Sequence, residues 1–180
     1  AAAFGIMPIS VSAMIGVGLM IAMGCLSWRD AAYALSTPVI MIIVTSLALG
    51  KALVSTGMAG YLAMSFVSIV SDMQIPLILS IFMLIMAILT NVVSNNAAAV
   101  IGTPIAIAIA QQLNVAPEPF VLAVLFGANM SYVTPYGYQT NLLILSAGGY
   151  KFSDFLKIGI PLTVIMWIGF SIVLPLLYVL

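Results

Sequence analysis

The stretch IPLILSIFMLIMAILTNVVSNNAAAVIGTPIAIAIAQQL, residues 75–113, decides the architecture of this chain. It is largely apolar but carries a polar cluster near its middle, made of Thr90, Asn91, Ser94, Asn95 and Asn96. As helices, residues 76–89 and 97–112 would each rise only about 20 to 25 Å, which is short for a hydrocarbon core of about 30 Å. The pattern predicts a re-entrant hairpin whose polar tip lies at membrane depth, with two full crossings as the alternative.

The composition places the rest of the chain in a membrane as well. Of its 180 residues, 64% are hydrophobic and 4% are charged, and the mean hydropathy is +1.32. Soluble domains carry roughly 25% charged residues, so we expect an all-α integral membrane protein. We expect its location to be a bacterial inner (plasma) membrane. The four basic and four acidic residues cancel, which argues against a nucleic-acid partner. The chain opens with AAAF rather than methionine, which suggests a piece of a longer protein.

The other apolar runs predict helices on either side of the central stretch. Residues 4–26 and 158–180 are long enough to span the bilayer, and residues 38–53 form a second helix between them. Residues 118–147 predict one helix that is broken in mid-membrane.

Residues 57–71 would rise only about 22 Å as a helix, which is short for a span. Tyr61, Ser65, Ser68 and Asp72 recur at steps of four, three and four, so they share one helical face. Leu62, Phe66 and Ile69 are expected on the other face. The pattern predicts an amphipathic helix lying in the membrane interface.

A second polar interruption, TPYGYQTN at residues 134–141, lies in the predicted broken helix. Pro135 removes a backbone donor there, and Gly137 loosens the backbone. In hydrocarbon an unsatisfied backbone group costs several kcal/mol, so irregular backbone at this depth must be buried in protein or line a cavity. We therefore expect the interruptions at residues 90–96 and 134–141 to form one site.

The residue types in this expected site suit the binding of a cation and an anion. Hydroxyl and amide oxygens can coordinate sodium, while amide N–H groups and the free N–H groups of a broken helix can hold a carboxylate or oxyanion. We therefore expect a secondary transporter working by alternating access, with sodium as the coupling ion and no other metal or cofactor. The alternative is that Ser, Thr and Asn only bridge packed helices, as small polar residues commonly do in membranes.

Two other classes of membrane protein compete with a transporter. An intramembrane hydrolase needs a base, but the sequence has no histidine and no carboxylate within an apolar run, so we predict no catalytic residue. A Ser-Lys dyad stays formally open, although every lysine lies near a predicted membrane surface. A purely structural, non-transporting membrane subunit would not need two polar breaks at matching depth.

Three motifs carry a resemblance to a known family: TNVVSNNAA at residues 90–98, TPYGYQTN at 134–141 and GGYKFSDFLKIG at 148–159. With LGKAL at 49–53, they make nearly the whole chain resemble the divalent anion:sodium symporter family of the ion transporter superfamily. The match is to the C-terminal one of two inverted repeats. The resemblance implies a scaffold helix pair, an interfacial arm helix, a re-entrant hairpin, a broken helix and a final span. It also implies an N-terminal repeat of the same permease and a homodimer in the lipid bilayer.

The resemblance further implies roles for individual residues. Ser94 and Asn95 match the family's Ser-Asn-Thr signature at the hairpin tip, whereas Asn96 replaces the threonine. The implied sodium-site residues are Thr90, Ser94, Asn95 and Thr134. The implied substrate contacts are Asn95, Asn96, Pro135, Gly137, Thr140 and Asn141. The expected substrate is a small anion such as a dicarboxylate or sulfate. An arsenite or sodium/proton transporter of the same superfamily is the alternative.

Overall fold

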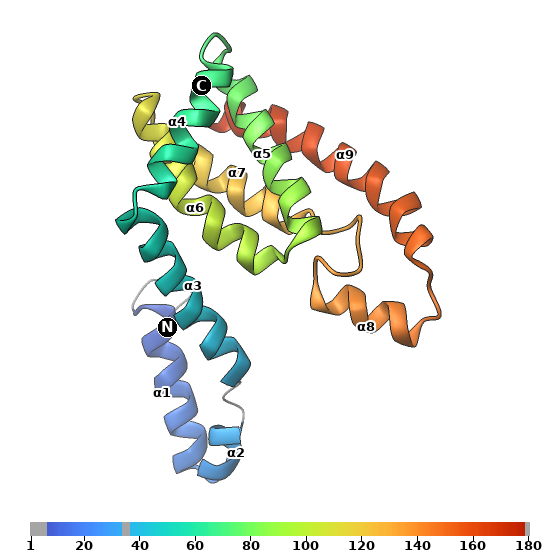
Figure 1. Ribbon diagram of the computed structural model, residues 1–180. Helices are drawn as coiled ribbons and strands as arrows, with labels where there is room; N and C mark the ends of the chain where they lie inside the picture. The colour runs from blue at the N-terminus through green and yellow to red at the C-terminus, as the bar shows by residue number, and fades with distance from the viewer. Residues whose placement is uncertain (1–6, 34–36, 179–180) are drawn as a thin grey trace. The chain divides into compact units, whose positions relative to one another are not determined.

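The computed structural model describes residues 7–33 and 37–178, and these residues form helices and connecting loops without a β-strand (Figure 1). The all-α class predicted from the sequence is thereby confirmed for this part of the chain. The helices are α1 (Ile9–Ala22), α2 (Trp28–Tyr33), α3 (Thr37–Ser55), α4 (Met58–Val70), α5 (Ile75–Val92), α6 (Asn95–Gln112), α7 (Glu118–Asn129), α8 (Gln139–Ala147) and α9 (Phe152–Tyr178). The chain divides into two compact units, Ala1–Ile43 and Val44–Leu180, and the boundary falls within α3.

The first unit contains α1, α2 and the beginning of α3. Helix α1 ends at Ala22, before the predicted limit of residue 26, because Gly24 adopts a left-handed backbone with φ of 72°. The N–H of Cys25 then donates to the carbonyl of Met20 at 2.9 Å and closes the helix end. No described side chain of α1 is buried, so its apolar surface is available to lipid or to protein outside this chain.

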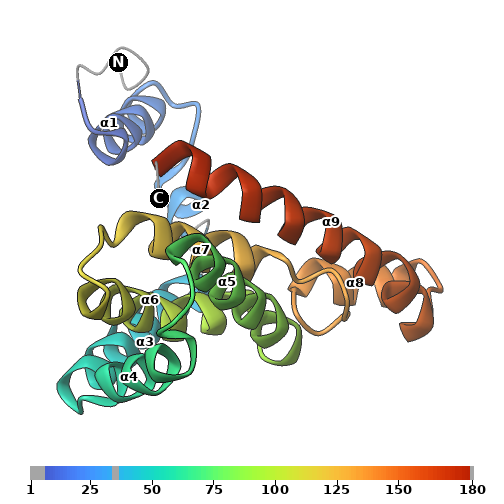
Figure 2. The same ribbon diagram turned by 90° about the horizontal axis from the view of Figure 1, so that it is seen from above.

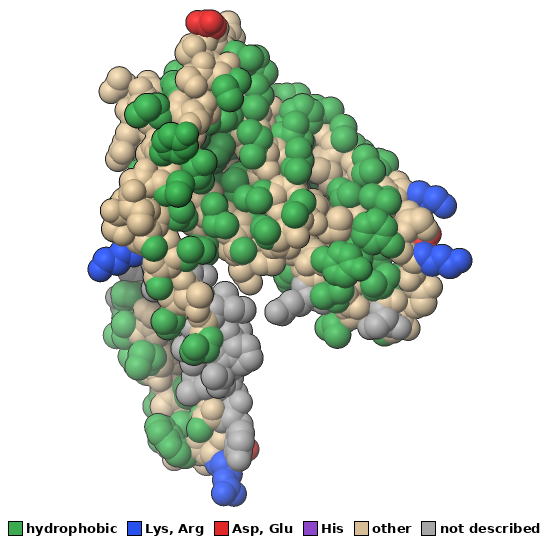
Figure 3. Space-filling view, viewed as in Figure 1, with side chains coloured by type: hydrophobic (Ala, Val, Ile, Leu, Met, Phe, Trp, Pro, Cys, Tyr) green, Lys and Arg blue, Asp and Glu red, His purple; other side chains and the backbone are tan. Residues whose placement is uncertain are grey.

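Among the described residues, two helices are long and apolar enough to cross a membrane, both in the second unit: α5 with 18 residues and α9 with 27. The last turns of α3, Ala48–Ser55, and helix α4 form a third candidate that is bent by 68°. Gly57 allows this bend, because it takes a left-handed φ of 73° between the two helices. Figure 3 shows apolar side chains over much of the surface in view, with charged side chains in a few small groups. The chain is part of an integral membrane protein.

The core of the second unit forms where α5, α6 and α7 pack together, with α4 against α6 and α9 against α5 and α7 (Figures 1 and 2). Gly102 on α6 and Gly127 on α7 make this packing possible. A Cβ atom on Gly102 would lie 2.7 Å from the sulfur of Met86, and one on Gly127 would lie 2.6 Å from the Met86 Cβ. Phe82 of α5 adds an aromatic contact to Phe120 of α7, with ring centroids 6.3 Å apart.

Helix α4 has an exposed polar face and an opposite face that packs inward. Its polar residues Tyr61, Ser65 and Ser68 are exposed, as the spacing indicates, but Ile69 is 78% exposed as well. The side chains that pack inward are those of Ala59, Ala63, Phe66 and Val70. At about 100° per residue, these four lie directly opposite the polar row, whereas Leu62 and Ile69 lie on its flank. The small alanines let α4 approach α6, whereas Leu62 and Ile69 stay exposed, as apolar side chains that face lipid would be.

Helix α9 begins at Phe152, earlier than the predicted start at residue 158. The carboxylate of Asp154 accepts a hydrogen bond from the N–H of Lys151 at 2.9 Å, which is the capping arrangement of a helix start. Further along, the indole N–H of Trp167 donates to the carbonyl of Ser80 at 2.9 Å, and the hydroxyls of Ser80 and Ser171 lie 2.7 Å apart. These hydrogen bonds stabilise the packing of α9 against α5.

Candidate functional site: two helix breaks that meet

The first helix break separates α5 from α6 and consists of Val93 and Ser94. Ser94 is the N-cap of α6, and its hydroxyl accepts a hydrogen bond from the N–H of Ala97 at 3.3 Å. The side-chain oxygen of Asn95 accepts from the N–H of Asn96 at 2.8 Å. The first turn of α6 therefore holds three of the predicted site residues, at the positive end of the helix dipole.

The second break separates α7 from α8 and covers residues 130–138. It starts earlier than the predicted interruption, and α8 begins at Gln139, so Thr140 and Asn141 lie in a helical first turn and not in the loop. Pro135 is fully buried. The amide nitrogen of Asn141 donates to the carbonyl of Ser131 at 2.8 Å and to that of Thr134 at 3.4 Å, which folds the loop back on the start of α8.

The two breaks touch each other, as the joint between α5 and α6 lies beside the loop after α7 (Figure 1). The N–H of Asn95 donates to the carbonyl of Gly137 at 3.1 Å. Gly137 is buried, and a Cβ atom there would lie 2.9 Å from both the Thr90 carbonyl oxygen and the Ser131 Cβ. Only glycine fits this contact without displacement, so the close approach explains the glycine better than loop flexibility does.

Asn91 makes most of the connections between the two breaks. Its amide nitrogen donates to the carbonyls of Ala87 at 2.7 Å and Met130 at 2.8 Å. Its side-chain oxygen accepts from the N–H groups of Val133 at 3.0 Å and Thr134 at 3.1 Å. Its backbone carbonyl accepts from the Thr134 hydroxyl at 2.7 Å. The sequence places Asn91 in the polar cluster but indicates no individual role for it, because its proximity to residues 130–134 exists only in the folded chain.

The threonines predicted as sodium-site residues lie at this junction. The Thr90 hydroxyl is fully buried and donates to the carbonyl of Ala128 at 2.7 Å, and the Thr134 hydroxyl donates to that of Asn91. A hydroxyl that donates its hydrogen keeps its oxygen lone pairs. Both side chains are thus held in place with their acceptor capacity unchanged.

Other predicted residues keep hydrogen-bonding groups without a partner among the described residues. These are the amide nitrogen of Asn95, the whole side chain of Asn96, and the hydroxyl and backbone N–H of Thr140. Asn96 and Thr140 are exposed in this chain, and among the described residues neither side chain forms a hydrogen bond to the opposite break. The start of α6 and the start of α8 therefore both offer donors to an anion, and neither break contains an acidic or basic side chain.

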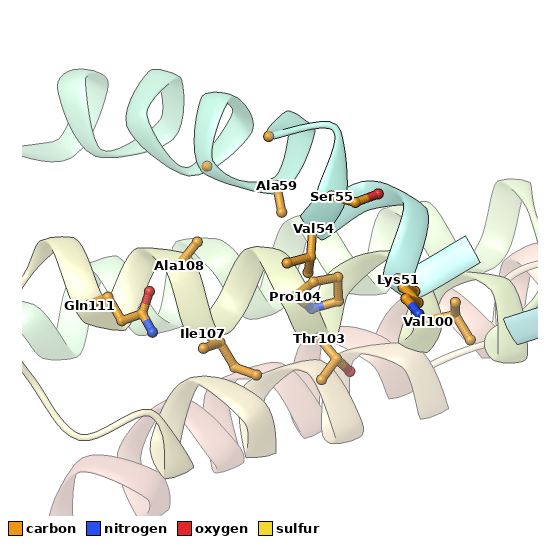
Figure 4. Close-up of a pocket in the computed structure, with 13 residues that line it drawn as sticks. Lys51, Val54, Ser55, Ala59, Val100, Thr103, Pro104, Ile107, Ala108 and Gln111 are labelled. Carbon is orange, nitrogen blue, oxygen red and sulfur yellow. The ribbon is translucent and has the colours of Figure 1, made fainter. Parts of the chain in front are cut away.

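A large cavity in the second unit lies away from these breaks. It is a groove of about 890 Å³ between the end of α3, the start of α4 and the middle of α6 (Figure 4). Val54, Pro104 and Ile107 are among its apolar walls, and Lys51 and Gln111 also line it. None of the predicted site residues lines it. A smaller cavity of about 230 Å³ between the 130–138 loop, α8 and α9 is lined by one of them, Asn141.

Several known proteins with similar sequences are named as transporters, which agrees with the class that the motifs indicate. An uncharacterized transporter of Synechocystis is 36% identical over 98% of this chain and 29% of its own length. An uncharacterized transporter of Escherichia coli is 31% identical over 95% of this chain and 28% of its own length. A probable sodium/sulfate cotransporter of Chlamydomonas reinhardtii is 30% identical over 91% of this chain and 18% of its own length.

The chain therefore spans less than a third of the length of these relatives. Their names point to transport and not to an enzyme. The family model described as citrate transporter matches residues 1–180. On these grounds the chain belongs to the citrate transporter family, within the ion transporter superfamily that its motifs indicate.

Proposed function

We propose that the protein containing this chain is a sodium-coupled symporter of a small anion, such as a dicarboxylate or sulfate, and works by alternating access. The observation that carries the proposal is the meeting of two uncharged helix breaks, held together by Asn91 and by the bond from Asn95 to Gly137. The family description as citrate transporter and the relatives named sodium/sulfate cotransporters support an anion as the solute and sodium as the coupling ion.

In this proposal the residues at the two breaks form a sodium site and an adjacent anion site. Sodium is coordinated by oxygens of Thr90, Ser94, Asn95 and Thr134, because hydroxyl, amide and carbonyl oxygens suit a hard cation. The anion is held at the helix starts, where Asn95, Asn96 and Thr140 offer unpaired donors. Pro135, Gly137 and Asn141 shape the opposite wall. Since the N–H groups of Asn141 already bind the loop, its side-chain oxygen is what remains for a ligand.

We further propose that residues 1–180 form the second of two inverted repeats. Helices α1 and α3 belong to the scaffold, α4 lies in the interface, α5 and α6 form a re-entrant hairpin, α7 and α8 form the broken helix, and α9 is the last span. Sites in such folds lie at the repeat interface near the bilayer midplane, so an N-terminal repeat would complete this one. The expected assembly is a homodimer in a bacterial inner membrane.

The test is uptake of sulfate, citrate and dicarboxylates by the full-length protein in proteoliposomes. We expect uptake that requires an inward sodium gradient and persists when a protonophore collapses the proton gradient, because neither break contains a carboxylate, lysine or histidine. Uptake that needs a pH gradient and ignores sodium would contradict the proposal and favour a proton-coupled member of the superfamily.

A further inference from the structure

Asn91 stands apart from the other polar residues of the two breaks, because its carboxamide has no free hydrogen-bonding capacity. An asparagine side chain offers two N–H donors and one oxygen with two lone pairs. In Asn91 both donors and both lone pairs are engaged, with the carbonyls of Ala87 and Met130 and the N–H groups of Val133 and Thr134. A ligand would have to break one of these bonds to reach the side chain.

Three of these four bonds cross from α5 to the loop after α7. The acceptor at Met130 and the donors at Val133 and Thr134 are backbone groups at the start of that loop, which no helix satisfies. The Thr134 hydroxyl adds a fourth crossing bond, to the backbone carbonyl of Asn91. The side chain of Asn91 thus provides hydrogen-bond partners for the backbone groups of the loop where α7 ends. These bonds fix the direction in which the loop leaves α7.

We propose that Asn91 is a positioning residue that binds neither sodium nor the anion and sets the alignment of the two breaks. This inference rests on the proposed function for its transport consequences, but its structural part stands alone. Aspartate could not replace Asn91, because a carboxylate would face the two carbonyls of Ala87 and Met130 without a donor. Leucine has a similar size and leaves the loop groups at Met130, Val133 and Thr134 without their partner.

The structural test measures the distance between the two breaks. Spin labels at Val92, which is 75% exposed, and Tyr136, which is 62% exposed, report on the end of α5 and on the loop. The background is the full-length protein with Cys25, an exposed free cysteine, changed to serine and any cysteine elsewhere replaced. We expect a narrow distance distribution in the parent and a distribution at least about twofold wider in Asn91→Leu.

Asn129→Leu is the matched control. Asn129 also donates from its amide nitrogen to a carbonyl four residues earlier, that of Leu125 at 2.7 Å, but no bond from its side chain crosses to another helix or loop among the described residues. Its removal should leave the distance distribution narrow. Thr134→Val removes one crossing bond at nearly constant volume and should widen the distribution by a smaller amount. If Asn91→Leu does not fold, the width measured for Thr134→Val shows whether the crossing bonds align the two breaks.

The transport measurement separates a positioning role from a ligand role. If Asn91 aligns both halves of the site, Asn91→Leu should weaken the apparent affinities for sodium and for the anion together, each on the order of tenfold, as loss of a supporting residue around an ion site does. A distribution that stays narrow in folded Asn91→Leu and Thr134→Val would overturn the proposal. So would a fall in sodium affinity alone with an unchanged distribution, which would make Asn91 a ligand. If the parent shows no sodium-dependent uptake, the proposed function fails and the distance measurement still judges the role of Asn91.

Discussion

Asparagines lie on both sides of the joint between α5 and α6, and they differ in how many of their side-chain groups have hydrogen-bond partners. Asn91, at the end of α5, uses its whole carboxamide on backbone groups. Asn95 and Asn96, at the start of α6, use only one side-chain oxygen, that of Asn95, and leave the remaining groups without a partner in the described part of the chain. The amide at position 91 is therefore structural, and those at positions 95 and 96 are available to a ligand.

This difference refines how polar residues in membrane segments are interpreted. Residue type and depth select all three asparagines equally, and they cannot separate helix contacts from ligand contacts. The remaining hydrogen-bonding capacity separates them, because a buried polar group that is already satisfied has little to gain from an ion.

Asn95→Ala should abolish sodium-dependent uptake while the protein still folds. The change removes an amide oxygen for the cation and an N–H₂ donor for the anion, but it keeps the backbone bond from residue 95 to Gly137. Uptake should be normalised to folded protein in the membrane and compared with Asn129→Ala, which we expect to transport like the parent. Full activity in folded Asn95→Ala would show that the open amide is not a ligand.

Gly159→Ala should destabilise the contact between α9 and the second break. A Cβ atom at residue 159 would overlap the carbonyl of Tyr132 and lie 2.7 Å from the Cα of Val133, so α9 or the loop must move. Overpacking of this kind typically costs about 1–3 kcal/mol. Gly169→Ala on the same helix meets nothing within 4 Å and should be neutral or slightly stabilising. Thermal unfolding in detergent compares the two, and equal melting temperatures would contradict the packing described.

Asn96→Thr should shift the preference among anions and leave the sodium dependence intact. The change restores a hydroxyl where the amide of Asn96 is exposed and unpaired, so it alters the groups offered to the anion without touching the bonds between the breaks. Competition of sulfate, citrate and dicarboxylates for uptake measures the shift. If Asn96 only joined helices, a polar contact of about 0.6 kcal/mol would be lost and the order of preference would not change.

The sequence predicted the helix breaks because their causes are local. Ser94 caps the helix that it begins, and Pro135 and Gly137 lie in a segment that cannot continue a helix. The role of Asn91 could not be predicted, since its partners lie about 40 residues away in sequence and their approach depends on how α5 and α7 pack. The packed face of α4 could not be predicted for the same reason, because the fit of Ala59 and Ala63 against α6 is a property of both helices.

If the two breaks form one site, Asn96 and Thr140 hold the same anion, and a double-mutant cycle between Asn96→Ala and Thr140→Val tests this claim. The two residues lie in the first turns of α6 and α8, and both carry groups without a partner in the described part of the chain. The measurement is the apparent affinity for the transported anion at saturating sodium in the parent, both single variants and the double variant. If both side chains hold the same anion, their effects should deviate from additivity by at least about 0.5 kcal/mol. Effects that add within about 0.3 kcal/mol would place the two breaks in separate environments and contradict the claim.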